Sequence, residues 1–292
     1  MVNNTMQTGN IADAGRGAAV RDDRIFPEIR VVGAIIVLVL IVASAILYLM
    51  PTRTGDFFAW TINPTMTPML MGAGYLSGGW FFFRAVRATR WHHITWGFPA
   101  ITAFVWFMGL ATFLHYEKFN HTHVSFYAWL FLYVVTPFLV PALWFRNRVT
   151  DPGTPDPVDV VVPAQIRQIS MIAGGVMLAI ALFLFLVPDV AISIWPWKVT
   201  PLTARVVAGW FALPGVVGLV LSRDSRWSAW RIMIEAQMIA LVLILVAVAR
   251  AWDQFNPGYW ATWGFVGGIA LLLLAVVALY VTMQGRRGAA RV

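Results

Sequence analysis

Two stretches of this chain share one pattern: IRVVGAIIVLVLIVASAILYLMP at residues 29–51 and IRQISMIAGGVMLAIALFLFLVP at residues 166–188. Each begins with Ile-Arg, continues through a long apolar run and ends at a proline. A helix needs roughly 17–25 apolar residues to cross a bilayer, so both runs are long enough to span a membrane. Their common order indicates an internal duplication with a shift of 137 residues.

The correspondence continues on the C-terminal side of both stretches. Matched positions at the same shift are Trp60 and Trp197, Pro64 and Pro201, Gly72 and Gly209, and Gly78 and Gly215. After one deletion the shift becomes 136, with matches of Arg90-Trp91 to Arg226-Trp227, Glu117 to Asp253, and Phe119-Asn120 to Phe255-Asn256. Four apolar runs per copy give both copies the same orientation, so we expect a parallel repeat about an axis along the membrane normal.

We therefore predict an all-α integral membrane protein with eight transmembrane helices, built as two tandem, parallel-oriented four-helix repeats. Hydrophobic residues make up 60% of the 292 residues and charged residues 12%, against about 25% charged residues in soluble domains. The apolar runs are continuous rather than alternating, which favours helices over a β-barrel. The expected spans are residues 31–50, 66–83, 96–114, 124–145, 168–187, 202–221, 232–249 and 260–283.

These repeats set the expected domain boundaries. They occupy residues 29–148 and 166–285, with a flexible cytoplasmic tail at residues 1–28 and a basic cytoplasmic tail at residues 286–292. A cytoplasmic linker rich in Pro and Asp, at residues 149–165, joins the two repeats. Its prolines favour a semi-extended conformation.

The basic residues are distributed unevenly along the chain. The net charge is +8, and most of the 21 Lys and Arg residues lie in alternate connecting segments. These residues are Arg16, Arg21, Arg24, Arg30, Arg84, Arg87, Arg90, Arg146, Arg148, Arg167, Arg223, Arg226, Arg231, Arg286, Arg287 and Arg291. This positive-inside pattern predicts a multi-pass protein of the bacterial inner (plasma) membrane with both termini in the cytoplasm. The basic charge then contacts headgroups of the lipid bilayer, and no nucleic-acid partner is expected.

Polar residues stand where the second, fourth, sixth and eighth spans begin. They are Asn63, Asn120, Thr200 and Asn256, and all except Asn120 are followed directly by a proline. Asn and Thr are favoured N-caps, because the side-chain oxygen accepts a hydrogen bond from a backbone N–H of the first turn. We expect all four side chains to cap the helices that follow them.

The segment His115-Tyr-Glu-Lys-Phe-Asn-His121-Thr-His123 is the candidate metal site. Imidazole suits zinc and copper, whereas thiolate ligands are excluded because the chain has no cysteine. The spacing matches no standard zinc motif, and the second repeat has Ala251, Pro257 and Tyr259 in place of the histidines. The alternative is an outer loop that contacts headgroups. Apart from zinc or copper here, no cofactor is expected.

Glu117 and Asp253 are the candidate catalytic residues. The duplication puts both carboxylates at one membrane depth, where a shared cleft could separate their pKa values and let them act as acid and base. The simpler interpretation is that each acid stabilises a nearby helix N-terminus. We also expect the loop that carries Glu117 to approach Arg250 and Asp253 of the other repeat.

Three ionisable residues near the span ends, Arg205, Arg250 and Glu235, are candidates for substrate binding. An arginine inside a span is a functional candidate, although Arg205 is close enough to the span end for its side chain to reach the interface. Glu235 is expected to pair instead with Arg231, four residues earlier on the same helix face. The adjacent His92 and His93 lie on a basic turn and are expected to contact headgroups.

Three classes of function remain open. The first is a permease or carrier that handles a small apolar or amphiphilic solute between the two repeats. The second is a non-catalytic scaffold or accessory subunit that contacts lipid, partner proteins or further copies of itself. The third, with less support, is an outer-face membrane enzyme that uses Glu117 and Asp253 with or without a metal. The span centres hold almost no ionisable residues, which disfavours an ion-coupled pump and leaves the permease as the favoured class.

Overall fold

Continuous apolar runs form helices in this protein, because a helix bonds every backbone N–H and C=O group within its own segment. The computed structural model describes residues 21–290, and within that range ten α-helices form the fold. They are α1 (Pro27–Ser44), α2 (Thr54–Phe57), α3 (Met66–Arg87), α4 (Gly97–Leu114), α5 (Val124–Asn147), α6 (Ala164–Leu186), α7 (Pro188–Ile194), α8 (Pro201–Leu221), α9 (Trp227–Arg250) and α10 (Trp260–Ala289). A π-helical turn, Ala45–Leu49, extends α1.

The protein is a multi-pass helical membrane protein. Seven helices of the described range are long and apolar enough to cross a bilayer: α4, α5, α6, α8, α9, α10, and α1 with its π-helical turn. The expected span at residues 66–83 falls on α3, which has sufficient length at 22 residues but is less apolar because it is rich in Gly. More than half of the residues of α3 are buried, so protein rather than lipid surrounds much of this helix.

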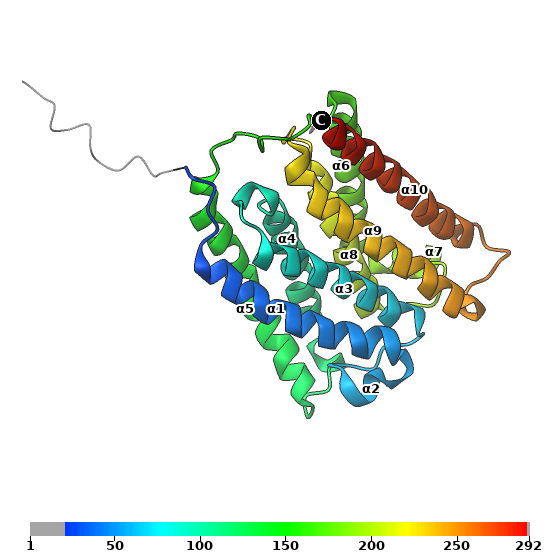
Figure 1. Ribbon diagram of the computed structural model, residues 1–292. Coiled ribbons are helices and arrows are strands. Elements are labelled where there is room, and N and C mark those ends of the chain that lie inside the picture. Colours follow the sequence, from blue (N-terminus) through cyan, green and yellow to red (C-terminus); the bar gives the residue numbers. More distant parts are fainter. Residues whose placement is uncertain (1–20, 291–292) are drawn as a thin grey trace, which may run out of the picture.

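The long helices run between two ends of the molecule (Figure 1). The linker between α5 and α6, the segment before α1 and the end of α10 meet at one end, which we call the linker end. There Asp23 N donates to Thr150 O over 2.9 Å, and Arg287 Nε donates to Val158 O over 2.9 Å. We call the opposite end, with α2 and α7, the loop end.

Glycines let pairs of helices approach closely. In the antiparallel contact between α6 and α8, a Cβ on Gly174 would lie 2.6 Å from the carbonyl oxygen of Gly215. A Cβ on Gly215 would in turn lie 2.9 Å from the backbone nitrogen of Leu178. Helix pairs in membranes associate through such close packing, since lipid is as apolar as the helix surface.

Of the four expected helix caps, one is confirmed and three are wrong. Thr200 caps α8: its hydroxyl accepts from Thr203 N, and Thr203 Oγ1 accepts from Thr200 N. Asn120 and Asn256 instead accept from Thr122 N and Gly258 N, in turns that precede α5 and α10. The N-cap of α5 is His123, whose Nδ1 accepts from Ser125 N.

Asn63 is not a cap either, because α3 begins at Met66 with Thr65 as its N-cap. The expectation for these asparagines was wrong because each helix begins at the start of its expected apolar span, three or four residues after the asparagine rather than directly after it. An Asn side chain that bonds the backbone two residues on forms a turn of its own. Such a turn carries the same residue preference as a helix cap.

The close contact between α6 and α8 predicts a position-specific cost of side-chain volume. Gly174→Leu should lower the thermal midpoint of the detergent-solubilised protein, since overpacking costs roughly 1–3 kcal/mol. Gly267→Leu on α10 is the matched control, because a Cβ there has nothing within 4 Å. Equal midpoints for the two variants would contradict this packing.

Candidate functional site

A cavity of about 210 Å³ lies midway between the two ends. Its walls come from α1, α3, α4, α5, α6, α8, α9 and α10, so residues on both sides of the linker line it. Aromatic and aliphatic side chains dominate the lining, including Phe81, Phe104, Trp210 and Phe265. Small-molecule sites are typically concave and mostly apolar, with a few polar groups that fix the ligand's orientation.

Polar groups in this cavity are few, and most of them already bond other groups of the protein. The hydroxyls of Tyr75 and Tyr133 bond each other over 2.8 Å, and Ser77 Oγ donates to Ala236 O over 2.8 Å. The indole N–H of Trp210 is buried and has no acceptor among the described residues. A buried Trp N–H usually finds a hydrogen-bond partner, so Trp210, a residue of the cavity lining, has an unpartnered donor that protein atoms cover.

Glu235 on α9 is held by several partners. Its carboxylate pairs with Arg231 at 3.5 Å, which confirms the expected contact four residues apart. It also pairs with Arg84 of α3, and it accepts from Trp80 Nε1 and Tyr280 OH, each at 3.2 Å. The carboxylate ties α3, α9 and α10 together near the linker end rather than facing the cavity.

The three histidines of the expected metal loop have separate partners. Nε2 of His115 accepts from Arg205 Nη1 over 2.7 Å, whereas His121 Nε2 contacts Tyr116 O over 2.9 Å. His123 caps α5, as described above. Burial, followed by the positive charge of Arg205, lowers the pKa of His115. The three rings therefore do not converge on one point.

The acidic and basic candidates at the loop end also have separate partners. Glu117 and Asp253 are exposed, each in the first turn of a short 3₁₀ helix, and Glu117 lies 4.0 Å from Lys118. Arg250 donates to Tyr48 O over 2.8 Å, and Arg205 Nε donates to Phe185 O over 3.1 Å.

Both arginines thus bond carbonyl groups near the ends of α1 and α6. The histidine loop contacts Arg205 of α8, whereas Arg250 and Asp253 were the expected partners.

A buried hydrogen-bonded chain at the linker end was missed from the sequence. Asp23 accepts from Nδ1 of His92, Nε2 of His92 lies 2.9 Å from Ser228 Oγ, and Ser228 Oγ bonds Asp159. His92 is fully buried, so the expected contact with headgroups is wrong for this residue. Its neighbour Trp91 is equally buried, and an aromatic residue beside a histidine was the only local signal.

The order Ser228, His92 and Asp23 matches the roles of a serine-hydrolase triad, in which an acid orients the histidine that activates the serine. Ser228 is only 3% exposed, however, and its hydroxyl is shared with Asp159. Ser228 and His92 are also absent from the lining of the central cavity. A substrate carbonyl has no route to this oxygen. These hydrogen-bonded side chains therefore have a structural role, and Ser228 does not act as a nucleophile.

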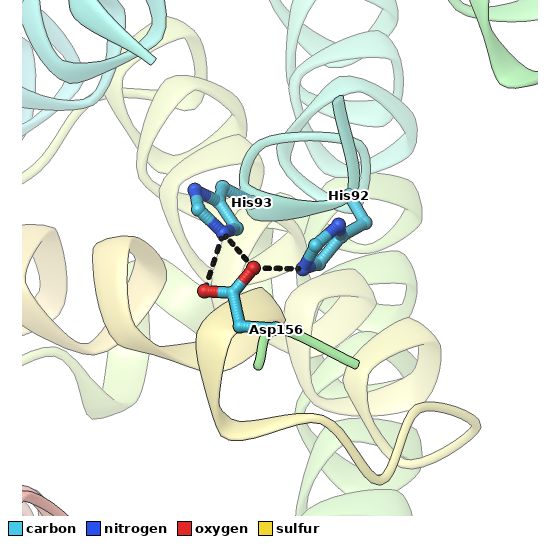
Figure 2. Close-up of side chains that lie close together, drawn as sticks. All are labelled: His92, His93 and Asp156. Atoms are coloured by element: carbon cyan, nitrogen blue, oxygen red, sulfur yellow. Dashed lines mark hydrogen bonds and ion pairs between the residues drawn. The ribbon is translucent and has the colours of Figure 1, made fainter. Parts of the chain in front are cut away.

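Asp156 from the linker sits beside both histidines (Figure 2). Its Oδ1 lies 3.5 Å from His92 Nε2, and His93 Nε2 lies 3.1 Å from each carboxylate oxygen. Arg90 and Arg287 also pair with this carboxylate, at 3.2 and 3.1 Å. Within the described range, His92, His93 and Asp156 are the one His/Asp/Glu group whose ligand atoms all lie within 4.8 Å of one another.

A second ion-pair group fixes the linker to the turn between α8 and α9. Arg226 pairs with Asp151 at 2.8 Å and with Asp224 at 2.7 Å, and Trp96 Nε1 donates to Asp224 over 2.7 Å. Burial acts to raise the pKa of Asp224, but the hydrogen bonds from Arg226 and Trp96 outweigh it and lower this pKa. The pKa of Asp151 is lowered in the same way.

No protein-family model, curated protein or solved structure matches this chain. The interpretation of these sites therefore rests on their own geometry.

The ion pairs of Arg226 predict a loss of stability in acid. The pKa values of Asp151 and Asp224 are lower in the folded protein than in the unfolded chain, where Asp titrates near about 3.9. The ionised carboxylates thus stabilise the fold above about pH 4, and this contribution disappears as the pH falls further. Thermal midpoints measured from about pH 7 to pH 3 should show a smaller acid loss for Asp224→Asn than for the wild type.

Asp56→Asn is the control for this measurement, because Asp56 is 60% exposed in its pair with Arg53. Its acid loss should equal that of the wild type. Removal of the buried cation by Arg226→Gln should cost roughly 3–5 kcal/mol near neutral pH, since two carboxylates are left unpaired. An Asp224→Asn profile that follows the wild type at every pH would show that this pair does not contribute.

Proposed function

We propose that this protein is a permease or carrier that binds a small apolar or amphiphilic solute in the central cavity. The observation that carries the proposal is the cavity itself, which is lined from both sides of the linker. Its apolar walls suit a solute that partitions into lipid, and charged solutes are disfavoured because a charge buried there would be unpaired. The free N–H of Trp210 suits a solute with one hydrogen-bond acceptor.

Reciprocal contacts support the proposal that the chain is two tandem four-helix repeats, at residues 29–148 and 166–285. α1 packs on α3 as α6 packs on α8, and α3 packs on α9 as α4 packs on α8. Trp91 N donates to Asp23 O and Trp227 N donates to Val160 O, at shifts close to those of the sequence repeat. In this arrangement the cavity lies at the interface of the repeats, where carriers with repeated folds bind substrate.

The two other functional classes have less support. An enzyme at the loop end needs Glu117 and Asp253 in one cleft, but both are exposed and neither lines the central cavity. A scaffold or accessory subunit explains the many exposed aromatic and aliphatic side chains, such as Phe131 and Trp260. A lipid-embedded protein of any function has such a surface, so this surface does not favour a scaffold over a carrier.

The proposed topology has eight spans, with α3 as the eighth, and both termini in the cytoplasm of a bacterial cell. An even number of spans puts both termini on one side of the membrane, whereas seven spans would put them on opposite sides. The bond from Asp23 N to Thr150 O supports the even number, because it brings the segment before α1 to the start of the linker after α5.

Single cysteines test this topology without background labelling, since the chain has no cysteine of its own. With an impermeant maleimide on whole cells, Thr122→Cys should be labelled from outside. Asp22→Cys before α1 and Thr154→Cys in the linker should be labelled only after the membrane is opened. All three positions are exposed. Labelling of Asp22→Cys, but not Thr154→Cys, from outside would exclude eight spans.

If a solute reaches the unpartnered N–H of Trp210 after a small movement of the ring, Trp210→Phe should have a selective effect on ligand binding. 2-Octanone has one acceptor and octane has none, and both should raise the thermal midpoint if they occupy the cavity. Trp210→Phe should weaken octanone binding roughly fivefold, since one hydrogen bond contributes about 1 kcal/mol, and leave octane binding unchanged. Trp195→Phe is the matched control, because its N–H is also unpartnered but it does not line the cavity.

Cavity filling provides the second arm of this experiment. Ala240→Phe on α9 adds a ring at the cavity wall, whereas Ala249→Phe adds the same ring on the exposed face of the same helix. Only Ala240→Phe should abolish the midpoint shift with both solutes. Shifts that persist in Ala240→Phe would place the solutes elsewhere and remove the main support for a carrier.

A further inference from the structure

We propose that His92, His93 and Asp156 form a binding site for one divalent transition-metal ion, with zinc as the first candidate. The ligand atoms are Nε2 of each imidazole and one oxygen of the carboxylate. This N/N/O set suits zinc, which binds His nitrogen and Asp oxygen at roughly 2.0–2.2 Å. The site lies at the linker end, distant in sequence from the histidine loop at residues 115–123.

Two of the three separations between ligand atoms are close to the edge of a tetrahedral zinc site. Bonds of roughly 2.0–2.1 Å give tetrahedral edges of about 3.3–3.4 Å. Nε2 of His92 lies 3.5 Å from Asp156 Oδ1, and Nε2 of His93 lies 3.1 Å from the same oxygen. The two imidazole nitrogens lie within 4.8 Å of each other, so all three atoms can reach one ion after movement of the side chains.

The contacts behind His92 also favour a metal ligand. Its other ring nitrogen, Nδ1, bonds the carboxylate of Asp23, and His92 N donates to the same carboxylate over 3.0 Å. A metal-bound histidine almost always donates its second N–H to a carboxylate, carbonyl or water, which fixes the tautomer and orients the ring. The ligating nitrogen of His92, Nε2, lies 2.9 Å from Ser228 Oγ, and an ion would replace this contact. Asp23 adopts φ of 60°, a backbone conformation that is uncommon for a non-glycine residue. The backbone bonds of Asp23 with Thr150 and Trp91 hold this residue in place.

The competing arrangement is an ion-pair centre without metal, in which Arg90 and Arg287 neutralise Asp156. Ligating carboxylates commonly accept further hydrogen bonds, so the two arginines do not exclude an ion. Asp23, Asp156 and Asp159 contribute three negative charges around the histidines, against two positive charges from the arginines. A divalent cation then leaves the group at +1 with both histidines neutral.

The ion can reach the site from solvent, and water can supply the fourth ligand. The side chain of His93 is 20% exposed, so an ion can enter from the aqueous side. No fourth His, Cys, Asp or Glu joins this group within residues 21–290, which leaves one position for water. The ion would join the turn before α4 to the linker, and through Asp23 to the segment before α1. Its role would be to hold the linker end together, independent of any solute in the cavity.

Metal titration of the full chain tests the site. Purified protein is stripped with chelator, and zinc is added back while bound metal and the thermal midpoint are measured. The wild type should retain about one equivalent and gain several degrees. His93→Ala and Asp156→Asn should each lose the bound ion and the midpoint shift. The variant with His115, His121 and His123 all changed to Ala should bind as the wild type does.

Cobalt gives a direct test of ligation in a variant that keeps the site intact. In His93→Cys the only thiol of the chain would become a ligand, and bound Co²⁺ should show a thiolate-to-metal charge-transfer band that the wild type lacks. A wild type that retains no zinc, zinc binding that survives both His93→Ala and Asp156→Asn, or cobalt bound to His93→Cys without this band would each overturn the proposal. Loss of binding in the triple histidine variant alone would move the ion to the loop end.

Discussion

The close packing of α3 against α1 governs how the remaining helices can be arranged. α3 is the long helix least suited to lipid, and a Cβ on its Gly72 would lie 2.9 Å from the backbone nitrogen of Tyr48. Ser44 Oγ of α1 donates to Gly72 O over 2.9 Å at the same contact. Because apolar contact alone does not hold helices together in lipid, this approach and its hydrogen bond position α3. The opposite side of α3, at Gly74 and Ser77, is left to line the cavity.

Polar interactions are sorted by depth in this molecule. The linker end holds the Asp23–His92–Ser228–Asp159 chain and the two-sided ion pair of Arg226. The middle of the bundle has hydroxyl and indole groups. Among the described residues, no ion pair reaches the cavity wall there. An unpaired charge at mid-membrane depth is costly. This distribution gives rigid ends and an apolar centre.

Periodicity and length in the sequence were sufficient to predict the long helices, because these properties are local. All seven candidate spans fall on expected runs, and α3 falls on the eighth. The linker-end site was not predictable in this way, since His92 meets Ser228 and Asp156 across 136 and 64 residues. A basic turn between two spans normally suggests solvent and headgroups. The buried Trp91 beside His92, matched by Trp227 beside Ser228, was the available sign that both turns fold inward.

Contacts between residues far apart in the sequence also limit how a solute could reach the cavity. Residues from before and after the linker are tied at the linker end by Trp96 with Asp224, and at the loop end by Arg205 with His115. Water-filled entry from either end would have to break such buried contacts. The cavity lining also includes Val39 and Leu272, which are 42% and 37% exposed on the apolar surface of the bundle. A solute already dissolved in the bilayer meets these residues first, so the geometry favours lateral entry and therefore an apolar or amphiphilic solute over a hydrophilic one.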